Sequence, residues 1–175
     1  SISSVGEAGV PVDNNLKALI DIIPWYDQRT ENIRNNFLKR NKNINIYKNT
    51  GLNSDHFYSA YKILWIKKNK LNIYKKIHKW LPVNDYYAMR LTGNISTDYS
   101  QAMRTLLFDP KKLNWSTTMI KKFQIKKSIL PHIINAGDKK GIFNKKIKKI
   151  LGITYDCVVG AGGHDHFVGI YGLGG

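Results

Sequence analysis

The sequence predicts one folded unit of mixed α/β class. Short apolar runs alternate with segments in which apolar residues recur every three or four positions, as in amphipathic helices. There is no internal repeat and no low-complexity linker that would mark a domain boundary. With 175 residues, 42% of them hydrophobic and 11% aromatic, the chain is long enough and apolar enough to bury a core of its own.

Strands are expected at the short apolar runs. The expected strands cover residues 2–5, 9–12, 18–23, 80–83 and 157–160. The turn Gly6-Glu7-Ala8 separates the first two, and Pro24 ends the third because proline has no N–H to donate to a neighbouring strand. The last strand runs into the glycine-rich residues 160–163.

Helices are expected where the apolar spacing is helical. The expected helices cover residues 27–40, 57–68, 72–77, 84–91, 117–123 and 144–151, and a last helix starts at about His166. Asp55 is a candidate N-cap for the second helix, and Asn84 or Asp85 for the fourth, since such side chains accept hydrogen bonds from free N–H groups. The fourth helix should stop before Gly93.

The formal net charge of +16 raises nucleic acid as a partner. Lysine, asparagine and isoleucine recur along the whole chain, which indicates compositional drift rather than one basic face. The lysine runs over 67–70 and 145–149 are typical of the solvated sides of amphipathic helices. We therefore expect no nucleic-acid partner, with a basic binding module as the open alternative.

Membrane insertion and secretion are not expected. No apolar run approaches the ~20 residues that span a bilayer. Residues 1–12 lack the basic start of a signal peptide and contain Glu7. The single cysteine, Cys157, cannot form a disulfide within the chain, and its apolar surroundings favour an ordinary buried thiol. A cytoplasmic location is expected.

The strongest local candidate for chemistry is the segment 158–166, where an apolar strand leads through glycines to an acid, Asp165. A carboxylate at the end of a strand can accept a proton from an alcohol, although Asp165 could equally only cap the helix that follows. The glycines do not form a P-loop, because no Gly-Lys-Ser/Thr follows them. His164 and His166 flank the acid, but no further His or Cys lies at ligand spacing, so no metal site is expected.

Two further places could bind a polar substrate. Residues 25–30 combine a tryptophan with Asp27 and Arg29, a set that can hold a polyhydroxy ligand or simply cap and pair within a helix start. Glu7 lies in a turn of small residues, where exposure to solvent is the default and binding of a ligand hydroxyl is the functional alternative.

Residues 57–69 resemble the signature of the FGGY carbohydrate kinases. That signature has a small hydroxyl residue or proline three positions before a lysine and a tryptophan three positions after it, as in Ser59, Lys62 and Trp65. The similarity to the family extends along the chain in the same order on both sides of this signature. It covers residues 25–30, 50–52, 85–86, 91–93, 97–100, 107–109, 115 and 162–166.

The resemblance implies a role for each matching position. Asp165 corresponds to the catalytic base, which takes a proton from the substrate hydroxyl, while Lys62 and Trp65 are expected to be elements of the fold. The substrate-binding residues are expected to be Glu7, Asp27, Arg29, Phe57 and His164. Gly6 and Phe57 stand where the glycerol kinase branch has an arginine and a tyrosine, which argues against glycerol itself as the substrate.

The resemblance also implies an RNase H-like (actin-like ATPase) fold, with ATP and Mg²⁺ as cofactors and a sugar or polyol as substrate. Residues 1–175 would form most of the N-terminal domain of such a kinase, without its first strands and its C-terminal domain. Such a piece is not expected to phosphorylate a sugar alone. A catalytically inactive sugar-binding or regulatory homologue is the alternative, and a homodimer remains open.

Overall fold

The computed structural model of the protein describes residues 1–174. The strands are β1 (Ile2–Ser4), β2 (Gly9–Val12), β3 (Lys79–Pro82), β4 (Ser96–Asp98), β5 (Phe108–Asp109), β6 (Asn114–Trp115), β7 (His132–Ile134), β8 (Lys139–Ile142) and β9 (Val158–His164). The helices are α1 (Glu31–Arg40), α2 (Ile46–Thr50), α3 (Ser59–Asn69), α4 (Leu71–Lys76), α5 (Val83–Thr92), α6 (Tyr99–Met103), α7 (Thr117–Phe123), α8 (Lys145–Leu151) and α9 (Asp165–Gly172). Short 3-10 helices cover Gln28–Thr30 (η1) and Lys127–Ile129 (η2).

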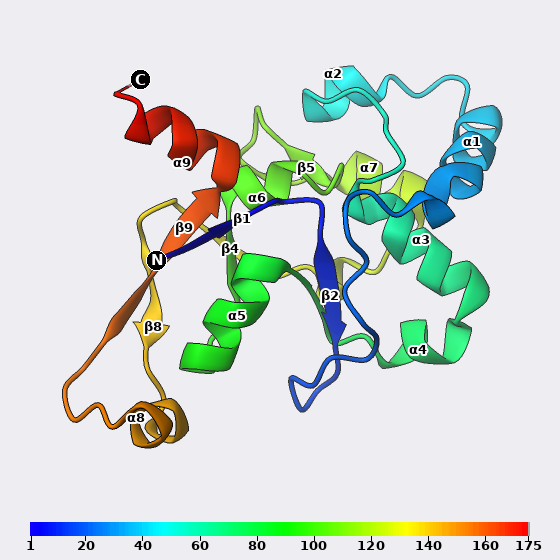
Figure 1. The fold of residues 1–175 in the computed structure, drawn as a ribbon. Coiled ribbons are helices and arrows are strands. Elements are labelled where there is room, and N and C mark those ends of the chain that lie inside the picture. The colour runs from blue at the N-terminus through cyan, green and yellow to red at the C-terminus, as the bar shows by residue number, and fades with distance from the viewer. Residues whose placement is uncertain (175) are drawn as a thin grey trace.

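A three-stranded sheet in the order β1-β9-β8 positions the C-terminal helix. β1 runs parallel to β9, with Ser4 opposite His164, and β8 runs antiparallel to β9. Figure 1 shows β9 leading directly into α9, with the N-terminus of the chain beside β9. Because parallel strands end at the same edge, the turn after β1 and the start of α9 meet there.

The larger hydrophobic core joins α1, α3 and α7 to β3. Phe37 and Phe123 stack with their ring centroids 4.1 Å apart, and Tyr61 meets the Phe123 ring edge-on. Trp80 of β3 is buried in the same core. A Cβ on Gly9 would lie 2.2 Å from the Trp80 ring, so only glycine allows β2 to pass over this tryptophan.

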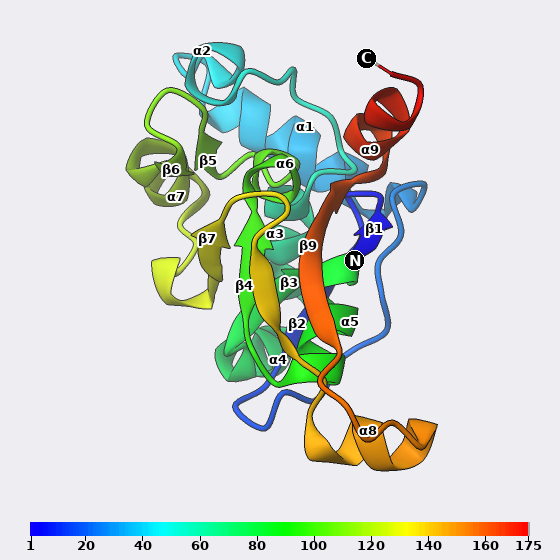
Figure 2. The same ribbon diagram turned by 90° about the vertical axis from the view of Figure 1, so that its left-hand side faces the viewer.

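A smaller cluster, made of Val10, Val12, Leu81 and Met89, packs between the β2–β3 pair and α5. α5 in turn contacts β1, β8 and β9, which links the two cores to the sheet that carries α9. Figure 2 shows α8 at the opposite end of β8 and β9 from α9. None of the described helices is long and apolar enough to cross a membrane.

The predicted strand over residues 18–23 is wrong. This stretch contributes only isolated bridges, from Ala18 to Val12 and from Ile23 to Gly9. The carbonyl groups of Ile23 and Pro24 accept hydrogen bonds from the Lys62 ammonium group instead of joining a ladder. The Lys62 side chain from α3 thus supplies hydrogen bonds that a neighbouring strand would otherwise donate.

The predicted helix caps at Asp55, Asn84 and Asp85 are also wrong. α3 begins at Ser59 without a side-chain cap, and Asp55 instead accepts from the backbone N–H of its neighbour His56. α5 begins directly after Pro82, which places Asn84 and Asp85 inside its first turn. Asp85 is buried there, and its Oδ1 pairs with Lys140 rather than with a backbone N–H of the helix.

The end of the chain also differs from the sequence-based expectation. The strand predicted over 157–160 continues as β9 to His164, so the glycine-rich residues lie inside the strand rather than in a loop after it. A Cβ on Gly162 would lie 2.1 Å from the carbonyl oxygen of Ile2, which shows how closely β1 approaches β9. α9 then starts at Asp165, one residue before the predicted start.

Candidate active site

Asp165 lies where β9 ends and α9 begins. Gly163 has a φ of +83°, in the left-handed region that favours glycine, and it turns the chain just before this point. The Asp165 side chain is 39% exposed, so its carboxylate can be reached from solvent. Asp165 therefore has the position that a base acting on a bound alcohol requires.

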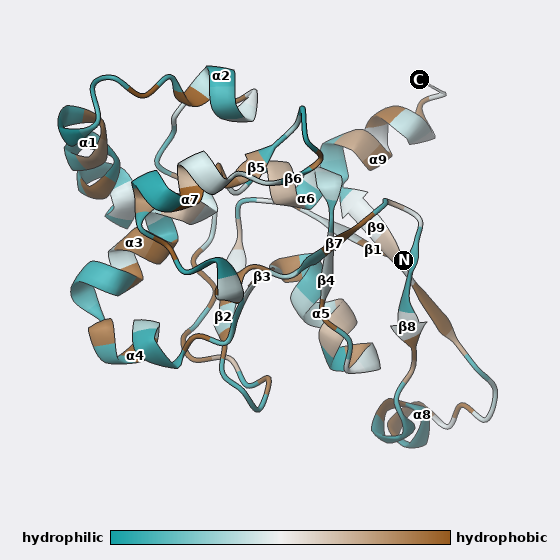
Figure 3. Ribbon diagram, turned by 180° about the vertical axis from the view of Figure 1, so that it is seen from behind, coloured by the Kyte–Doolittle hydropathy of each residue, from teal (hydrophilic) through white to brown (hydrophobic). Residues whose placement is uncertain are grey.

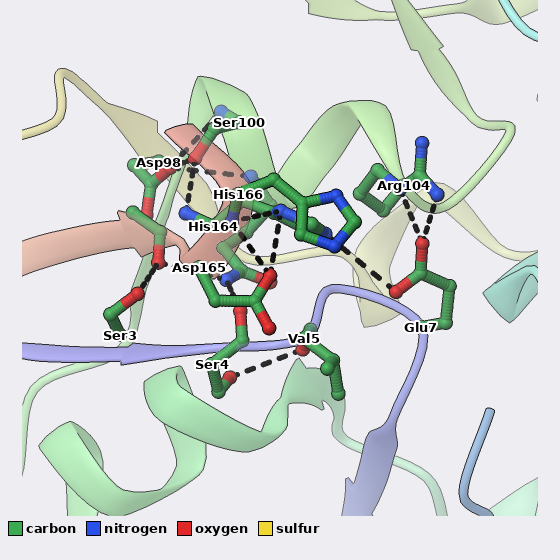
Figure 4. A network of polar contacts seen from close by, with 12 residues as sticks. Ser3, Ser4, Val5, Glu7, Asp98, Ser100, Arg104, His164, Asp165 and His166 are labelled. Carbon is green, nitrogen blue, oxygen red and sulfur yellow. Dashed lines mark hydrogen bonds and ion pairs between the residues drawn. The ribbon is translucent and has the colours of Figure 1, made fainter. Parts of the chain in front are cut away.

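The His164 ring is buried between two carboxylates, those of Asp165 and Glu7 (Figure 4). Its Nδ1 accepts a hydrogen bond from the His166 backbone N–H at 3.2 Å and lies 3.0 Å from Asp165 Oδ1. Its Nε2 lies 3.7 Å from Glu7 Oε2, beyond hydrogen-bond distance. The backbone N–H of His164 donates to the Ser100 hydroxyl at 2.8 Å, which fixes this residue against α6.

Glu7 is buried in the turn between β1 and β2, which excludes the exposed default for this acid. Its Oε1 accepts from the Arg104 guanidinium, and the two side chains form an ion pair. Burial alone would raise the pKa of the Glu7 carboxyl. The His164 imidazole and the Arg104 guanidinium outweigh burial and lower that pKa from 4.5 to about 2. Glu7 is therefore a permanent buried anion near neutral pH.

The guanidinium beside Glu7 belongs to Arg104. Position 6, where the resemblance places an arginine in the glycerol kinase branch, is a glycine here. A Cβ on Gly6 would lie 2.5 Å from Arg104 Cγ and 2.9 Å from His164 Cδ2, so these two side chains fill the space above the Gly6 backbone. The Arg104 guanidinium also lies over the Tyr58 ring, 5.1 Å from its centroid. The arrangement therefore requires glycine at position 6, because a larger residue would collide with Arg104 and His164.

Lys62 ties the Glu7 turn to the rest of the domain. Its fully buried ammonium group donates to the backbone carbonyls of Glu7, Ile23 and Pro24. Burial lowers the pKa of the Lys62 amine to about 8, although the charges of Glu7 and Asp27 oppose this shift. The expectation that Lys62 is an element of the fold agrees with these contacts.

Asp27 and Arg29 form a pair of their own. Arg29 Nε donates to both carboxylate oxygens of Asp27 at 2.9 Å, and its guanidinium lies 4.9 Å from the centroid of the Trp65 ring. The hydrogen bond from Arg29 lowers the pKa of the Asp27 carboxyl. Asp27 also caps η1 through the Arg29 backbone N–H. Lys62 is close to both places, because it donates to the Glu7 and Pro24 carbonyls and the Asp27 charge acts on its pKa.

Phe57 packs on its sequence neighbours rather than on the Glu7 cluster. Its ring centroid lies 4.6 Å from that of Tyr58 and 5.7 Å from that of His56. Since Tyr58 carries the Arg104 guanidinium on its ring, Phe57 lies one residue removed from the site. The structure thus brings together Glu7, His164 and Asp165 and leaves the other predicted substrate residues at the periphery.

Arg104 and Ser100 were missed as members of the site. Asp98 caps α6 by accepting from the backbone N–H groups of Ser100 and Gln101, which orients the Ser100 hydroxyl toward His164. Asp98 followed three residues later by Gln101 is a helix-start signal that could have located this helix. Nothing in the sequence near Arg104 points to Glu7, which lies 97 positions earlier.

His164, Asp165 and His166 each offer a ligand atom, and these atoms lie within 4.8 Å of one another. Nδ1 of His164 already accepts from the His166 backbone. The three residues are consecutive in sequence, and no fourth ligand joins them among the described residues. The group therefore carries no metal assignment.

A Glu7→Gln substitution is expected to lower the free energy of unfolding by about 2 kcal/mol at pH 7. The folded pKa of about 2 lies below the unfolded value of 4.5, so Glu7 stabilises the fold fully above pH 4.5 and loses this effect as pH falls toward 2. The difference corresponds to at most about 3 kcal/mol, and glutamine keeps an acceptor for Arg104. Urea unfolding at several pH values measures the effect, with the exposed Glu31→Gln as the matched control. Equal losses at pH 7 and pH 3 would contradict the expectation.

The mixed α/β fold, with an acid at the end of a strand, is that of an RNase H-like (actin-like ATPase) domain. The model of the FGGY family of carbohydrate kinases, N-terminal domain, matches residues 1–172. The chain belongs to the FGGY family of carbohydrate kinases. The fold expected from the sequence is therefore confirmed.

Curated relatives and solved structures agree with this assignment. A xylulose kinase from Staphylococcus xylosus is 34% identical over 169 residues, covering 94% of this chain and 34% of the relative. An L-fuculokinase from Escherichia coli is 25% identical, covering 99% of this chain and 37% of the relative. The ligand-bound xylulose kinase structure from Lactobacillus acidophilus superposes with a TM-score of 0.90 at 27% identity, covering 98% of this chain and 35% of that one. The chain thus spans about a third of the length of these relatives.

Proposed function

We propose that this chain carries the acceptor side of the active site of an ATP-dependent kinase that phosphorylates a sugar or polyol hydroxyl. The observation that supports it best is the exposed Asp165 carboxylate at the end of β9, beside the buried Glu7 and His164. This is the position at which the family resemblance places the catalytic base. The names of the relatives, xylulose kinase and L-fuculokinase, agree in reaction type and differ in sugar.

In the proposed reaction, Asp165 accepts the proton of the substrate hydroxyl as the substrate oxygen attacks the γ-phosphate of ATP and ADP leaves. Phosphoryl transfer depends mainly on positioning and on stabilisation of charge, so one well-placed base is the protein contribution expected here. Glu7 and the partly exposed Arg104 can accept from and donate to further hydroxyl groups of the substrate. Asp27, Arg29 and Phe57 remain proposed contacts at the edge of the site.

Mg²⁺, which accompanies ATP in kinases, supplies charge stabilisation at the phosphates. It prefers carboxylate, carbonyl and water oxygens, whereas the described cluster at the site offers two imidazoles and the acid proposed as the base. These residues do not fit the ion, and no Mg²⁺ ligand in this chain is proposed.

We further propose that the chain functions as most of the N-terminal domain of a longer cytoplasmic protein. One support is that the chain spans about a third of the length of its relatives. The other is the exposure of apolar side chains on α9. Phe167, Ile170 and Tyr171 are 53%, 55% and 81% exposed, and Figure 3 shows hydrophobic residues along this helix. Apolar side chains gathered on one surface are usually covered by another domain or partner.

Sugar-dependent ADP release by the full-length protein that contains this chain tests the function. A panel of ketoses, aldoses and polyols is expected to yield at least one substrate. Asp165→Ala should lower the rate with that substrate by about 10²- to 10⁴-fold, since this is the usual contribution of a general base. Asp156→Ala, which removes an exposed acid paired only with Lys148, is the matched control. A folded protein that binds ATP but releases no ADP with any sugar would favour the inactive homologue.

A further inference from the structure

We propose that His164 is a positioning residue that shares the proton taken up by Asp165, and that Glu7 orients the imidazole from the opposite side. This inference rests on the proposed role of Asp165 as the base. It also replaces direct substrate contact as the role of His164, because the ring is almost completely buried (2% exposed).

His164 Nδ1 and Asp165 Oδ1 lie close enough to share a proton. The two atoms lie 3.0 Å apart, and both accept from the same His166 backbone N–H, at 3.2 and 2.9 Å. A carboxylate oxygen and a bare imidazole nitrogen are both acceptors and repel at this distance. The contact becomes favourable when one proton lies between them, on either atom.

The other side of the ring faces a buried anion. His164 Nε2 is buried without a hydrogen-bond partner among the described residues, and it lies 3.7 Å from Glu7 Oε2. Since a neutral imidazole carries a single N–H, the amide contact at Nδ1 places that hydrogen on Nε2, directed at Glu7. The Arg104 ion pair keeps the Glu7 carboxylate in place.

Charged and titratable groups from several elements face the ring. The groups that face His164 are the Glu7 carboxylate from the β1–β2 turn, the Asp165 carboxylate and His166 from α9, and the Arg104 guanidinium from the segment after α6. The Ser100 hydroxyl of α6 contacts only the His164 backbone. The two carboxylates carry two negative charges and the guanidinium carries one positive charge, so the net charge of these groups around the imidazole is negative.

The proton balance of the step is simple. The O–H bond of the substrate breaks as the substrate oxygen bonds to the γ-phosphorus, and the proton moves to the Asp165 carboxylate. The bond from the γ-phosphorus to the β–γ bridging oxygen breaks, and ADP leaves with its electron pair. The proton then lies between Asp165 Oδ1 and His164 Nδ1, with any imidazolium charge stabilised by Glu7. It leaves to solvent through Asp165, which is the exposed member of the pair.

Steady-state kinetics of the full-length protein with its substrate separate this role from direct binding. His164→Asn is expected to lower kcat about 10-fold or more while KM changes less than about 3-fold, since an asparagine can occupy the Nδ1 position but cannot take up the proton. His132→Asn, which changes an exposed histidine on β7, is the control. A raised KM with unchanged kcat would overturn the proposal in favour of substrate contact. If kcat falls and KM rises in proportion to a lowered Tm, the proposal is overturned in favour of a purely structural role.

A second measurement needs no turnover, so it keeps this proposal distinct from the proposed function. In ¹⁵N NMR of the histidine rings, the Nδ1 signal of His164 is expected to shift in an Asp165→Asn variant. The ring signals of His132 should stay unchanged. If the His164 signals also stay unchanged, there is no shared proton, whatever the kinase assay shows.

Discussion

A Gly162→Ala substitution is expected to lower the free energy of unfolding by about 3 kcal/mol or more. The added Cβ would lie 2.1 Å from the carbonyl oxygen and 2.4 Å from the carbonyl carbon of Ile2. The colliding atoms belong to the backbone of β1, so no side chain can rotate away, and the strands must separate. Urea unfolding followed by tryptophan fluorescence measures the loss.

Gly160→Ala provides the matched control, because Gly160 lies on the same strand two residues earlier. The nearest atoms to its Cβ would lie 3.8 Å away, which is ordinary van der Waals contact. We expect a change within about 0.5 kcal/mol for this variant. Equal stabilities for the two variants would show that β1 and β9 do not approach each other as described.

A Lys140→Met substitution is expected to lower the free energy of unfolding by about 3 to 5 kcal/mol. The Lys140 ammonium group pairs with Asp85 and also donates to the Ser96 carbonyl at 2.9 Å. Both side chains of the pair are buried, at 3% and 0% exposed. Removing one partner leaves a buried charge without compensation, which is far more costly than removing both.

Two further variants test that explanation. The double variant Lys140→Met, Asp85→Asn carries neither charge and should regain at least half of the lost stability. Lys139→Met changes the exposed neighbour on β8 and should have an effect within about 0.5 kcal/mol. If Lys140→Met and Lys139→Met behave alike, the ion pair does not stabilise the fold.

The helices and strands that could be predicted are those whose own residues carry the periodicity or the cap that defines them. The apolar periodicity around Tyr61 and Ile63 marked α3, and the capping Asn144 preceded the helix that became α8. β8 was missed because its sequence, Lys-Lys-Gly-Ile, resembles a charged loop. Its strand character depends on pairing with β9 and on the burial of Lys140, which are properties of the tertiary structure.

Three candidate site residues could be selected from the sequence. Glu7, His164 and Asp165 were expected to act on the substrate, and the structure brings these three together. Arg104 could not be found, because its partner Glu7 is distant in sequence and the intervening packing decides their contact. The lysine-rich composition similarly hid Lys140, since no sequence feature separates it from the exposed lysines around it.

The Lys62 amine has a consequence for chemical labelling. Its pKa of about 8 leaves a large fraction of the amine unprotonated at mildly alkaline pH, which is the form that acylating reagents attack. Complete burial against three carbonyl groups nevertheless shields it in the closed domain. Acylation of Lys62 therefore has to wait for α3 to separate from the Glu7 turn. Its rate, compared with that of the surface lysines, reports how often the domain opens at this place.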